Sequence, residues 1–196
     1  MSAGGAHLEL SVLGPLRARR DGIDVALGGR RQKAVLARLA LAEGATVPVE
    51  RLVDDLWDGD PPRTAVGTVQ SYVSNLRRAL GRDGEPVIER VGDGYRLAID
   101  PSALTAARFE DLVARAARPA GSRPTRTEVD AALALLDEAL ALWHGTALAD
   151  LADEPWAQPS AVRLEELIRA APEQWHLQQP NWPTDHEALE AFRASR

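Results

Sequence analysis

The sequence of 196 residues has no cysteine, and it has no uninterrupted apolar run of the length that a membrane span requires. The absence of cysteine excludes disulfides, thiolate-ligated zinc, thiol nucleophiles and cysteine-bound iron–sulfur clusters from this chain. The most apolar stretch, residues 34–42, is interrupted by Arg38, and residues 1–10 contain no basic segment typical of a signal peptide. We therefore expect a cytoplasmic chain with no signal peptide, no membrane span and no membrane partner.

Motifs for catalysis and for cofactor binding are also missing. The only lysine, Lys33, follows the pair Gly28-Gly29, but the glycine and the serine or threonine that flank the lysine of a phosphate-binding loop are absent. The four histidines are scattered without a metal-ligand spacing, and no serine lies in a nucleophile elbow. The carboxylates Asp54 and Asp55 are typical of a solvated helix face. We expect no enzymatic activity, no metal and no cofactor.

The net charge of −6 is distributed unevenly along the chain. Residues 1–100 contain 14 basic and 14 acidic side chains, whereas residues 101–196 contain 9 and 15. Residues 61–82 include four arginines and no acid, although five acids lie between residues 50 and 60. A nucleic-acid partner is compatible with the acidic average because this basic strip is local.

The first hundred residues predict a small sheet followed by three helices. Apolar and polar residues alternate over residues 8–12, 16–19 and 23–27, which is typical of antiparallel strands. Helical spacing follows between Gly29 and Glu43, then in residues 48–57, where Pro48 suits the first turn, and in residues 64–80. In the third helix we expect Thr64 to be the N-cap, and the core-facing stripe to consist of Val66, Val69, Val73, Leu76 and Leu80.

A predicted hairpin follows the third helix. Residues 87–91 and 95–99 have strand composition and are joined by Gly92-Asp93-Gly94, which favours a tight turn. A polar-faced helix followed by such a hairpin is the order of a winged helix-turn-helix, in which the helix enters the DNA major groove and the hairpin lies beside the backbone or minor groove. The alternative for the helix alone is an amphipathic surface helix.

The second half predicts helices only. Apolar residues at helical spacing cover residues 105–118, 127–143 and 159–171. A tail rich in tryptophan and proline follows. We thus expect an α+β winged helix-turn-helix unit at residues 1–100, an all-α unit at residues 101–171, and the tail at residues 172–196.

Eight segments carry a family resemblance. In the first half they are LGPLRARRDG at 13–22, LGGRRQKAVLARLAL at 27–41, LVDDLWDGDPP at 52–62, TVQSYVSNLRRALG at 68–81 and GDGYRLAI at 92–99. In the second half they are RFEDLVARA at 108–116, ALLDEALALWHGTALADL at 134–151 and ADEPWAQPSAVRLEEL at 152–167. The first group resembles the OmpR-type DNA-binding domain of the Streptomyces antibiotic regulatory protein family, and the second resembles that family's bacterial transcriptional activation domain.

The resemblance implies a transcription regulator that binds direct repeats in promoter double-stranded DNA, with protomers side by side as a homodimer on DNA. It also implies contact with RNA polymerase and its sigma factor, through a domain of tetratricopeptide-like helix pairs. By position in the third helix, we expect Thr68, Tyr72 and Asn75 to read bases, and Arg77 and Arg78 to hold phosphates. The other candidates for DNA contact are Arg63, Ser71, Arg90 and Tyr95. The place of Asn75 is often basic in OmpR-type domains, and asparagine favours adenine over guanine.

The resemblance ends near residue 171, where the family's helical domain usually continues. A protein–protein interaction module and an activation-deficient DNA binder stay open as alternatives. An enzyme is a further alternative, because residues 172–182 are faintly similar to bacterial lipid acyltransferases, but the chain lacks catalytic residues. We expect the stripe Val162, Leu167 and Ile168 to be covered by the DNA-binding unit, which gives a chain that binds DNA and activates transcription poorly.

Overall fold

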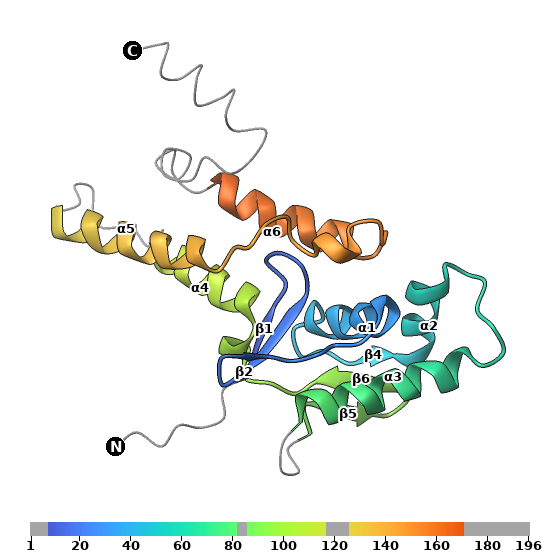
Figure 1. Cartoon of the computed structure of the whole chain (residues 1–196). Coiled ribbons are helices and arrows are strands. Elements are labelled where there is room, and N and C mark those ends of the chain that lie inside the picture. The colour runs from blue at the N-terminus through green and yellow to red at the C-terminus, as the bar shows by residue number, and fades with distance from the viewer. Residues whose placement is uncertain (1–7, 82–85, 117–125, 171–196) are drawn as a thin grey trace.

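Among the residues that the structure describes, two antiparallel three-stranded sheets and three helices form the first part of the chain, and three further helices form the second part (Figure 1). The computed structural model describes residues 8–81, 86–116 and 126–170. The tail predicted at 172–196 and the predicted helix residues 117, 118 and 171 lie outside the described residues. Within these ranges, no helix combines the length and the apolarity that a membrane crossing needs.

The first sheet contains β1 (Leu8–Ser11), β2 (Arg17–Arg20) and β3 (Ile23–Asp24) in that order. Its buried face carries Leu10 and Ala18, which pair directly across β1 and β2, so the predicted alternation is confirmed there. The third strand is shorter than predicted, because the chain leaves the sheet after Asp24 and places Leu27 in the core before α1 begins.

The three predicted helices of the first part are α1 (Arg30–Ala40), α2 (Val49–Trp57) and α3 (Ala65–Leu80). The core stripe of α3 differs from the prediction at its first position: Ala65 is buried, whereas Val66 is 48% exposed. Both positions are compatible with helical spacing, and the packing of α3 on α1 and α2 decides between them. Thr64 occupies the N-cap position, but its side chain makes no capping hydrogen bond.

The second sheet is the predicted hairpin with an added strand. Strands β5 (Ile88–Val91) and β6 (Gly94–Leu97) pair across the turn, and β4 (Val47–Pro48) pairs with the other edge of β6. A Cβ on Gly94 would lie 2.5 Å from the Val47 carbonyl oxygen, so the close approach of β4 requires glycine there. Pro48 is the N-cap of α2, not part of its first turn as predicted.

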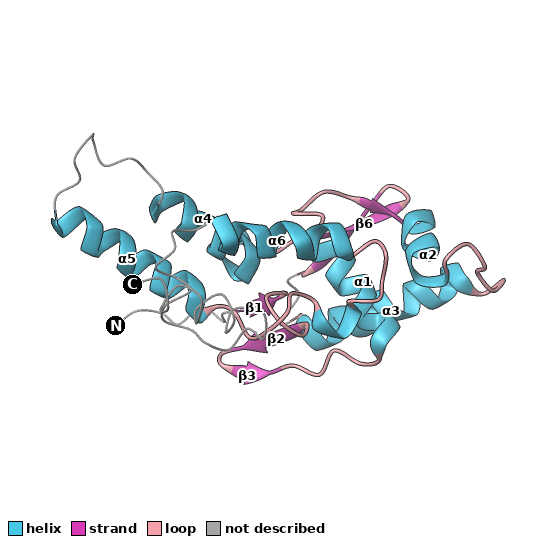
Figure 2. Ribbon diagram, turned by 90° about the horizontal axis from the view of Figure 1, so that it is seen from above, coloured by secondary structure: helices cyan, strands magenta, loops and turns pink. Residues whose placement is uncertain are grey.

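The second part begins with a 3₁₀ turn, η1 (Pro101–Ala103), followed by α4 (Thr105–Ala116) and α5 (Arg126–Ala141). Helices α4 and α5 pack against each other, and the buried Phe109 ring meets Trp143 edge to face at 5.5 Å. A second 3₁₀ turn, η2 (Ala149–Leu151), precedes α6 (Gln158–Ala170). Viewed from above, α4 and α5 lie toward one end of the molecule, α2 and α3 lie toward the other, and α6 lies between them (Figure 2).

The loop between α5 and α6 joins the two parts through backbone hydrogen bonds. The amide of His144 donates to the Leu13 carbonyl at 2.7 Å, and the amide of Leu148 donates to the Val12 carbonyl at 3.0 Å. Leu148 and Leu151 are fully buried in the same core as the first sheet. Both parts therefore share one continuous core.

Helix α6 divides its apolar residues between core and solvent. Leu164 is fully buried and Leu167 is partly buried, whereas Val162 is 49% exposed, so the predicted coverage of the whole stripe is wrong at Val162. The side chain of Ile168 lies outside the described residues. Arg163 pairs with Glu43 at the end of α1 and with Glu110 of α4, which links α6 to both parts.

Candidate nucleic-acid interface

Helix α3 presents one buried and one exposed face, and the exposed face lies on the opposite side of the first part from α6 (Figure 1). The buried Val69, Val73 and Leu76 fix this orientation. The opposite face is exposed and contains no carboxylate; it consists of Gly67, Gln70, Ser71, Ser74, Asn75 and Arg78. We name these six residues the α3 outer face. Its small and polar side chains are the kind that reach base edges in a groove.

Two hydroxyl groups among the predicted DNA contacts, those of Thr68 and Ser71, are bonded to backbone carbonyls four residues earlier. The Thr68 hydroxyl donates to the Thr64 carbonyl at 3.0 Å, and the Ser71 hydroxyl donates to the Gly67 carbonyl at 2.9 Å. Each hydroxyl oxygen keeps lone pairs that accept hydrogen bonds. Tyr72 is half-buried and lines an open cavity of about 580 Å³ together with Arg31 and Leu56.

Asn75 is exposed, and its side-chain amide is hydrogen-bonded to a residue of α1 that the sequence reasoning missed. Its Nδ2 donates to Oε1 of Gln32 in α1 at 3.3 Å, and Nε2 of Gln32 donates to the Leu27 carbonyl at 3.0 Å. Gln32 is only 9% exposed. A usable signal was present, because position 32 is on the buried stripe of α1 with Val35 and Leu36, where a polar residue needs partners.

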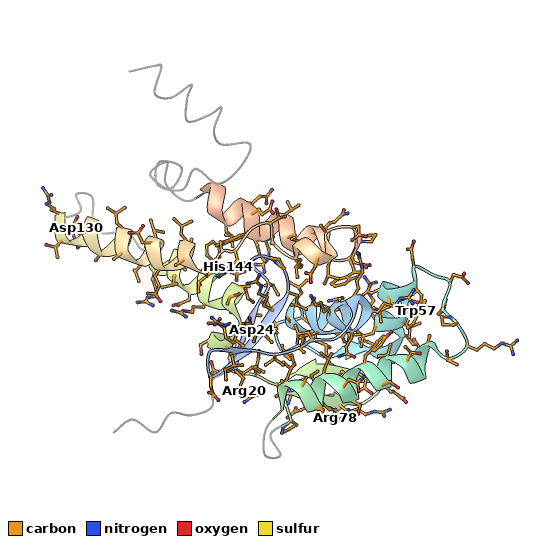
Figure 3. The ribbon with its side chains drawn as sticks, viewed as in Figure 1. Arg20, Asp24, Trp57, Arg78, Asp130 and His144 are labelled. Atoms are coloured by element: carbon orange, nitrogen blue, oxygen red, sulfur yellow. The ribbon has the colours of Figure 1, made fainter. Side chains whose placement is uncertain are left out.

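The predicted phosphate-binding arginines fall into two classes. Arg63, in the turn before α3, and Arg78 are exposed, and neither has an ion-pair partner among the residues that the structure describes. Figure 3 shows Arg78 on the lower side of α3. Arg77 differs, because its Nε donates to the Ile88 carbonyl at 2.7 Å and its guanidinium lies 5.7 Å from the centre of the Tyr95 ring. Arg77 therefore attaches β5 and β6 to α3.

The hairpin of β5 and β6 exposes a different set of side chains from the one predicted. Tyr95 is 4% exposed, so its ring belongs to the core and we withdraw it as a DNA contact. Arg90 is exposed, and its Nε lies 3.4 Å from the Gly92 carbonyl at the turn. Arg96 pairs with Glu89 directly across the strands at 2.6 Å. Gly92 has a φ of +58°, the conformation that the first position of a type II′ turn requires.

Three of the four cations of α1 are engaged with carboxylates, and the fourth, Arg31, lies over the Trp57 ring at 5.4 Å. Lys33 Nζ lies 2.8 Å from Asp150 Oδ2, and the other oxygen of Asp150 accepts the Leu16 amide at 2.9 Å. Arg30 bonds both Asp153 and Glu154 of the same loop. The hydrogen bond from Arg30 holds the pKa of Asp153 below its usual range and raises the pKa of Arg30. These acids belong to the second part, so the pairs are contacts between the two parts.

A further pair lies between α1 and α2: Arg38 Nε contacts Asp55 at 2.8 Å, and the Asp55 side chain is 6% exposed. Asp55 was predicted to be solvated charge, and this structure corrects that expectation, since a buried carboxylate needs such a partner. No group of three histidine or carboxylate side chains in the described ranges is placed to hold a metal ion.

Two families match successive parts of the sequence. Residues 24–97 match the family described as "Transcriptional regulatory protein, C terminal", and residues 104–179 match the "Bacterial transcriptional activator domain". Both are families of transcriptional regulators and not of enzymes. The first match covers α1 to β6, and the second begins at the end of η1.

Two relatives align with both parts of the chain. The chain is 40% identical over 173 residues to the regulatory protein AfsR of Streptomyces coelicolor, which covers 87% of this chain and 16% of AfsR. It is 35% identical over 167 residues to the regulatory protein DnrI of Streptomyces peucetius, which covers 81% of this chain and 60% of DnrI. The chain thus spans less than two thirds of each relative.

A solved structure has the same fold. Mycobacterium tuberculosis EmbR, in complex with a low-affinity phosphopeptide, superposes with a TM-score of 0.72 at 34% identity, over 83% of this chain and 42% of EmbR. The winged-helix prediction for the first part is confirmed by this likeness and by the first family match. With both families matched in this order, the chain belongs to the Streptomyces antibiotic regulatory protein family of transcriptional regulators.

Proposed function

We propose that this chain is a sequence-specific binder of double-stranded DNA that inserts α3 into the major groove and acts as a transcriptional activator at promoter direct repeats. The observation that carries the proposal is the α3 outer face: a 16-residue helix whose exposed side is polar, free of carboxylates and turned away from the second part. An α-helix of this kind fits the width of the major groove.

The residues divide into readers and anchors. Thr68, Ser71, Tyr72 and Asn75 are placed along α3 to meet base edges. Three exposed arginines are available to phosphates: Arg63 in the turn before α3, Arg78 near the end of α3, and Arg90 on the hairpin. We assign Arg77 and Tyr95 to the attachment of the hairpin, because their contacts are internal.

The test is selection of bound oligonucleotides from a random pool by the whole chain, followed by binding measurements over a range of salt concentrations. We expect two copies of one half-site in direct orientation, bound by two protomers on one face of the DNA. Affinity should fall steeply with salt, because phosphate contacts release counterions. Recovery of no common sequence, with affinity that does not depend on salt, would refute the proposal.

The second part is proposed to contact RNA polymerase and its sigma factor. Helices α4 and α5 form one antiparallel pair of the tetratricopeptide type, and α6 supplies one helix of a second pair, with Val162 exposed. This exposed residue favours a second candidate, a chain that binds DNA and activates weakly by itself. In vitro transcription with RNA polymerase and the principal sigma factor separates the two: strong activation by the 196-residue chain supports the activator, and occupancy of the site without activation supports the second candidate.

A further inference from the structure

Gln32 is a polar side chain in an apolar setting. It lies in the first turn of α1, is 9% exposed, and belongs to the same buried stripe as Val35 and Leu36. A nearly buried amide needs partners for both its nitrogen and its oxygen, because little of it is exposed to water. The partners that it finds determine what Gln32 does.

The orientation of the Gln32 amide is fixed by the chain before α1. Its Nε2 donates to the Leu27 carbonyl at 3.0 Å, and a carbonyl can only accept, so the nitrogen must face Leu27. Gly28, with a φ of +79°, provides the room: a Cβ there would lie 2.6 Å from Nε2. The oxygen Oε1 is therefore turned toward α3.

Asn75 receives its orientation from Gln32 in turn. Its Nδ2 donates to Oε1 of Gln32 at 3.3 Å, although the two residues are 43 positions apart. An asparagine nitrogen carries two N–H groups, so one N–H and the oxygen Oδ1 remain for the exposed side. One donor beside one acceptor is the pattern that matches adenine at N7 and N6 in the major groove.

We infer that Gln32 is a positioning residue for base recognition, which holds the Asn75 amide in the orientation that reads adenine without touching DNA itself. The inference rests on the proposed function of α3. A mobile asparagine presents its donor and acceptor in either order and loses side-chain freedom on binding, whereas the held amide presents one order before DNA arrives. Selectivity at one base position then depends on a buried residue of another helix.

The test compares three single variants of the whole chain by competition binding against the selected site and its single-base variants. Asn75→Ala should reduce the preference for adenine at one position by about tenfold. Gln32→Met keeps the length of the side chain and removes the amide, and should reduce the same preference by about fivefold while binding to unrelated DNA is unchanged. The matched control is Gln158→Met on α6, an exposed glutamine whose amide lies 3.5 Å from the Ala152 carbonyl, and it should change nothing.

One further variant guards against a trivial loss of folding. The double variant Gln32→Met with Asn75→Ala should lose no more preference than Asn75→Ala alone, because both act through one contact.

The outcomes separate this inference from the proposed function. If the unmodified chain selects no sequence, the proposed function fails and the inference fails with it. If the unmodified chain selects a site and Gln32→Met retains the full adenine preference, the inference alone is overturned. Equal weakening on every sequence, together with a lower melting temperature, would show a merely structural Gln32 and would also overturn it.

Discussion

Three cations of α1 and three cations around α3 have opposite surroundings. Each of the first set lies against carboxylates supplied by α2 or by the loop before α6: Arg30, Lys33 and Arg38. Each of the second set is exposed and, among the described residues, has no carboxylate within ion-pair distance: Arg63, Arg78 and Arg90. The first set is neutralised by the protein itself, and the second is available to an external polyanion.

This difference reconciles a net charge of −6 with the proposed binding to DNA. Binding to phosphates gains from cations that are exposed and unpaired, because they replace counterions on the DNA. A cation already paired inside the protein would have to break that pair first. Where the acids lie therefore matters more than how many there are. The α3 outer face contains no carboxylate, whereas four carboxylates lie against α1: Asp55, Asp150, Asp153 and Glu154.

The largest effect is expected on stability, from removing a carboxylate that pairs with a cation of α1. Asp150→Ala removes the acceptor of both Lys33 Nζ and the Leu16 amide, and leaves a partly buried peptide N–H without a partner. We expect the free energy of unfolding to fall by about 2 kcal/mol in urea denaturation. Asp137→Ala, on the exposed side of α5, is the control and should stay within about 0.5 kcal/mol of the unmodified chain. A similarly small change for Asp150→Ala would mean that the contacts of Asp150 with Lys33 and Leu16 do not hold the two parts together.

Substitution of an exposed arginine around α3 should change the affinity for DNA and leave the stability of the fold unchanged. Arg78→Ala should weaken binding to all DNA sequences by about tenfold at 0.1 M salt, and lower the slope of log affinity against log salt by about 0.9, the contribution of one phosphate. The melting temperature should not change, since Arg78 is exposed. Arg115→Ala on α4, which carries an exposed pair with Asp111, should leave the slope unaltered. A change in base preference for Arg78→Ala would contradict its assignment to the backbone.

A smaller effect on binding is expected at the hairpin. Arg90→Ala should weaken DNA binding by about threefold, because its guanidinium is exposed beside the turn and contacts a single phosphate at most. Arg96→Ala is the matched variant on the facing strand, where the arginine is paired with Glu89, and its effect on the salt slope should be smaller still. Electrophoretic mobility shifts with both variants give the comparison. Loss of thermal stability in Arg90→Ala with intact DNA binding would refute a role of the hairpin in binding.

The smallest effect is a pH dependence of the contact between Arg30 and Asp153. The pKa of Asp153 is lower in the folded chain than in the unfolded chain, because Arg30 donates a hydrogen bond to the ionised carboxylate. Stability from this pair is therefore present above the ordinary carboxyl range and is lost as the pH falls through the lowered pKa. Urea denaturation of Asp153→Asn and the unmodified chain should differ slightly at about pH 6, and the difference should shrink as the pH falls below the ordinary carboxyl range. A difference that grows on acidification would contradict the sign.

Local patterns in the sequence predicted much of the first part, because helical spacing and strand alternation are read from neighbours along the chain. The three helices and the pairing of β5 with β6 follow from such patterns. Strand β4 was missed, since it is two residues long and exists only because Gly94 allows Val47 to approach β6. The exchange of Val66 for Ala65 in the core has the same origin: only the partner helices decide which of two neighbouring residues turns inward.

The sequence predicted which residues of the candidate site are exposed on α3, but not which residues their side chains contact. The sequence placed Asn75 and Arg78 on the exposed side of α3, and the structure shows both exposed. It could not separate Arg77 from Arg78, because the partner of Arg77 is a carbonyl of β5 that lies 11 positions away. The roles of Gln32 and Asp150 depend on residues 43 and 134 positions away, which no spacing rule connects.

The two hydrogen bonds from His144 and Leu148 to the turn after β1 have a consequence for how such proteins are recombined. One family match ends at residue 97 and the other begins at residue 104. A cut between these residues does not separate two independent cores, because both parts share one core. A fragment that stops there would leave the Leu13 and Val12 carbonyls unpaired and expose the surface that Leu148 and Leu151 cover. Chimeras that exchange the second part between relatives should therefore carry the turn at residues 12–16 along with it, so that donor and acceptor come from the same parent.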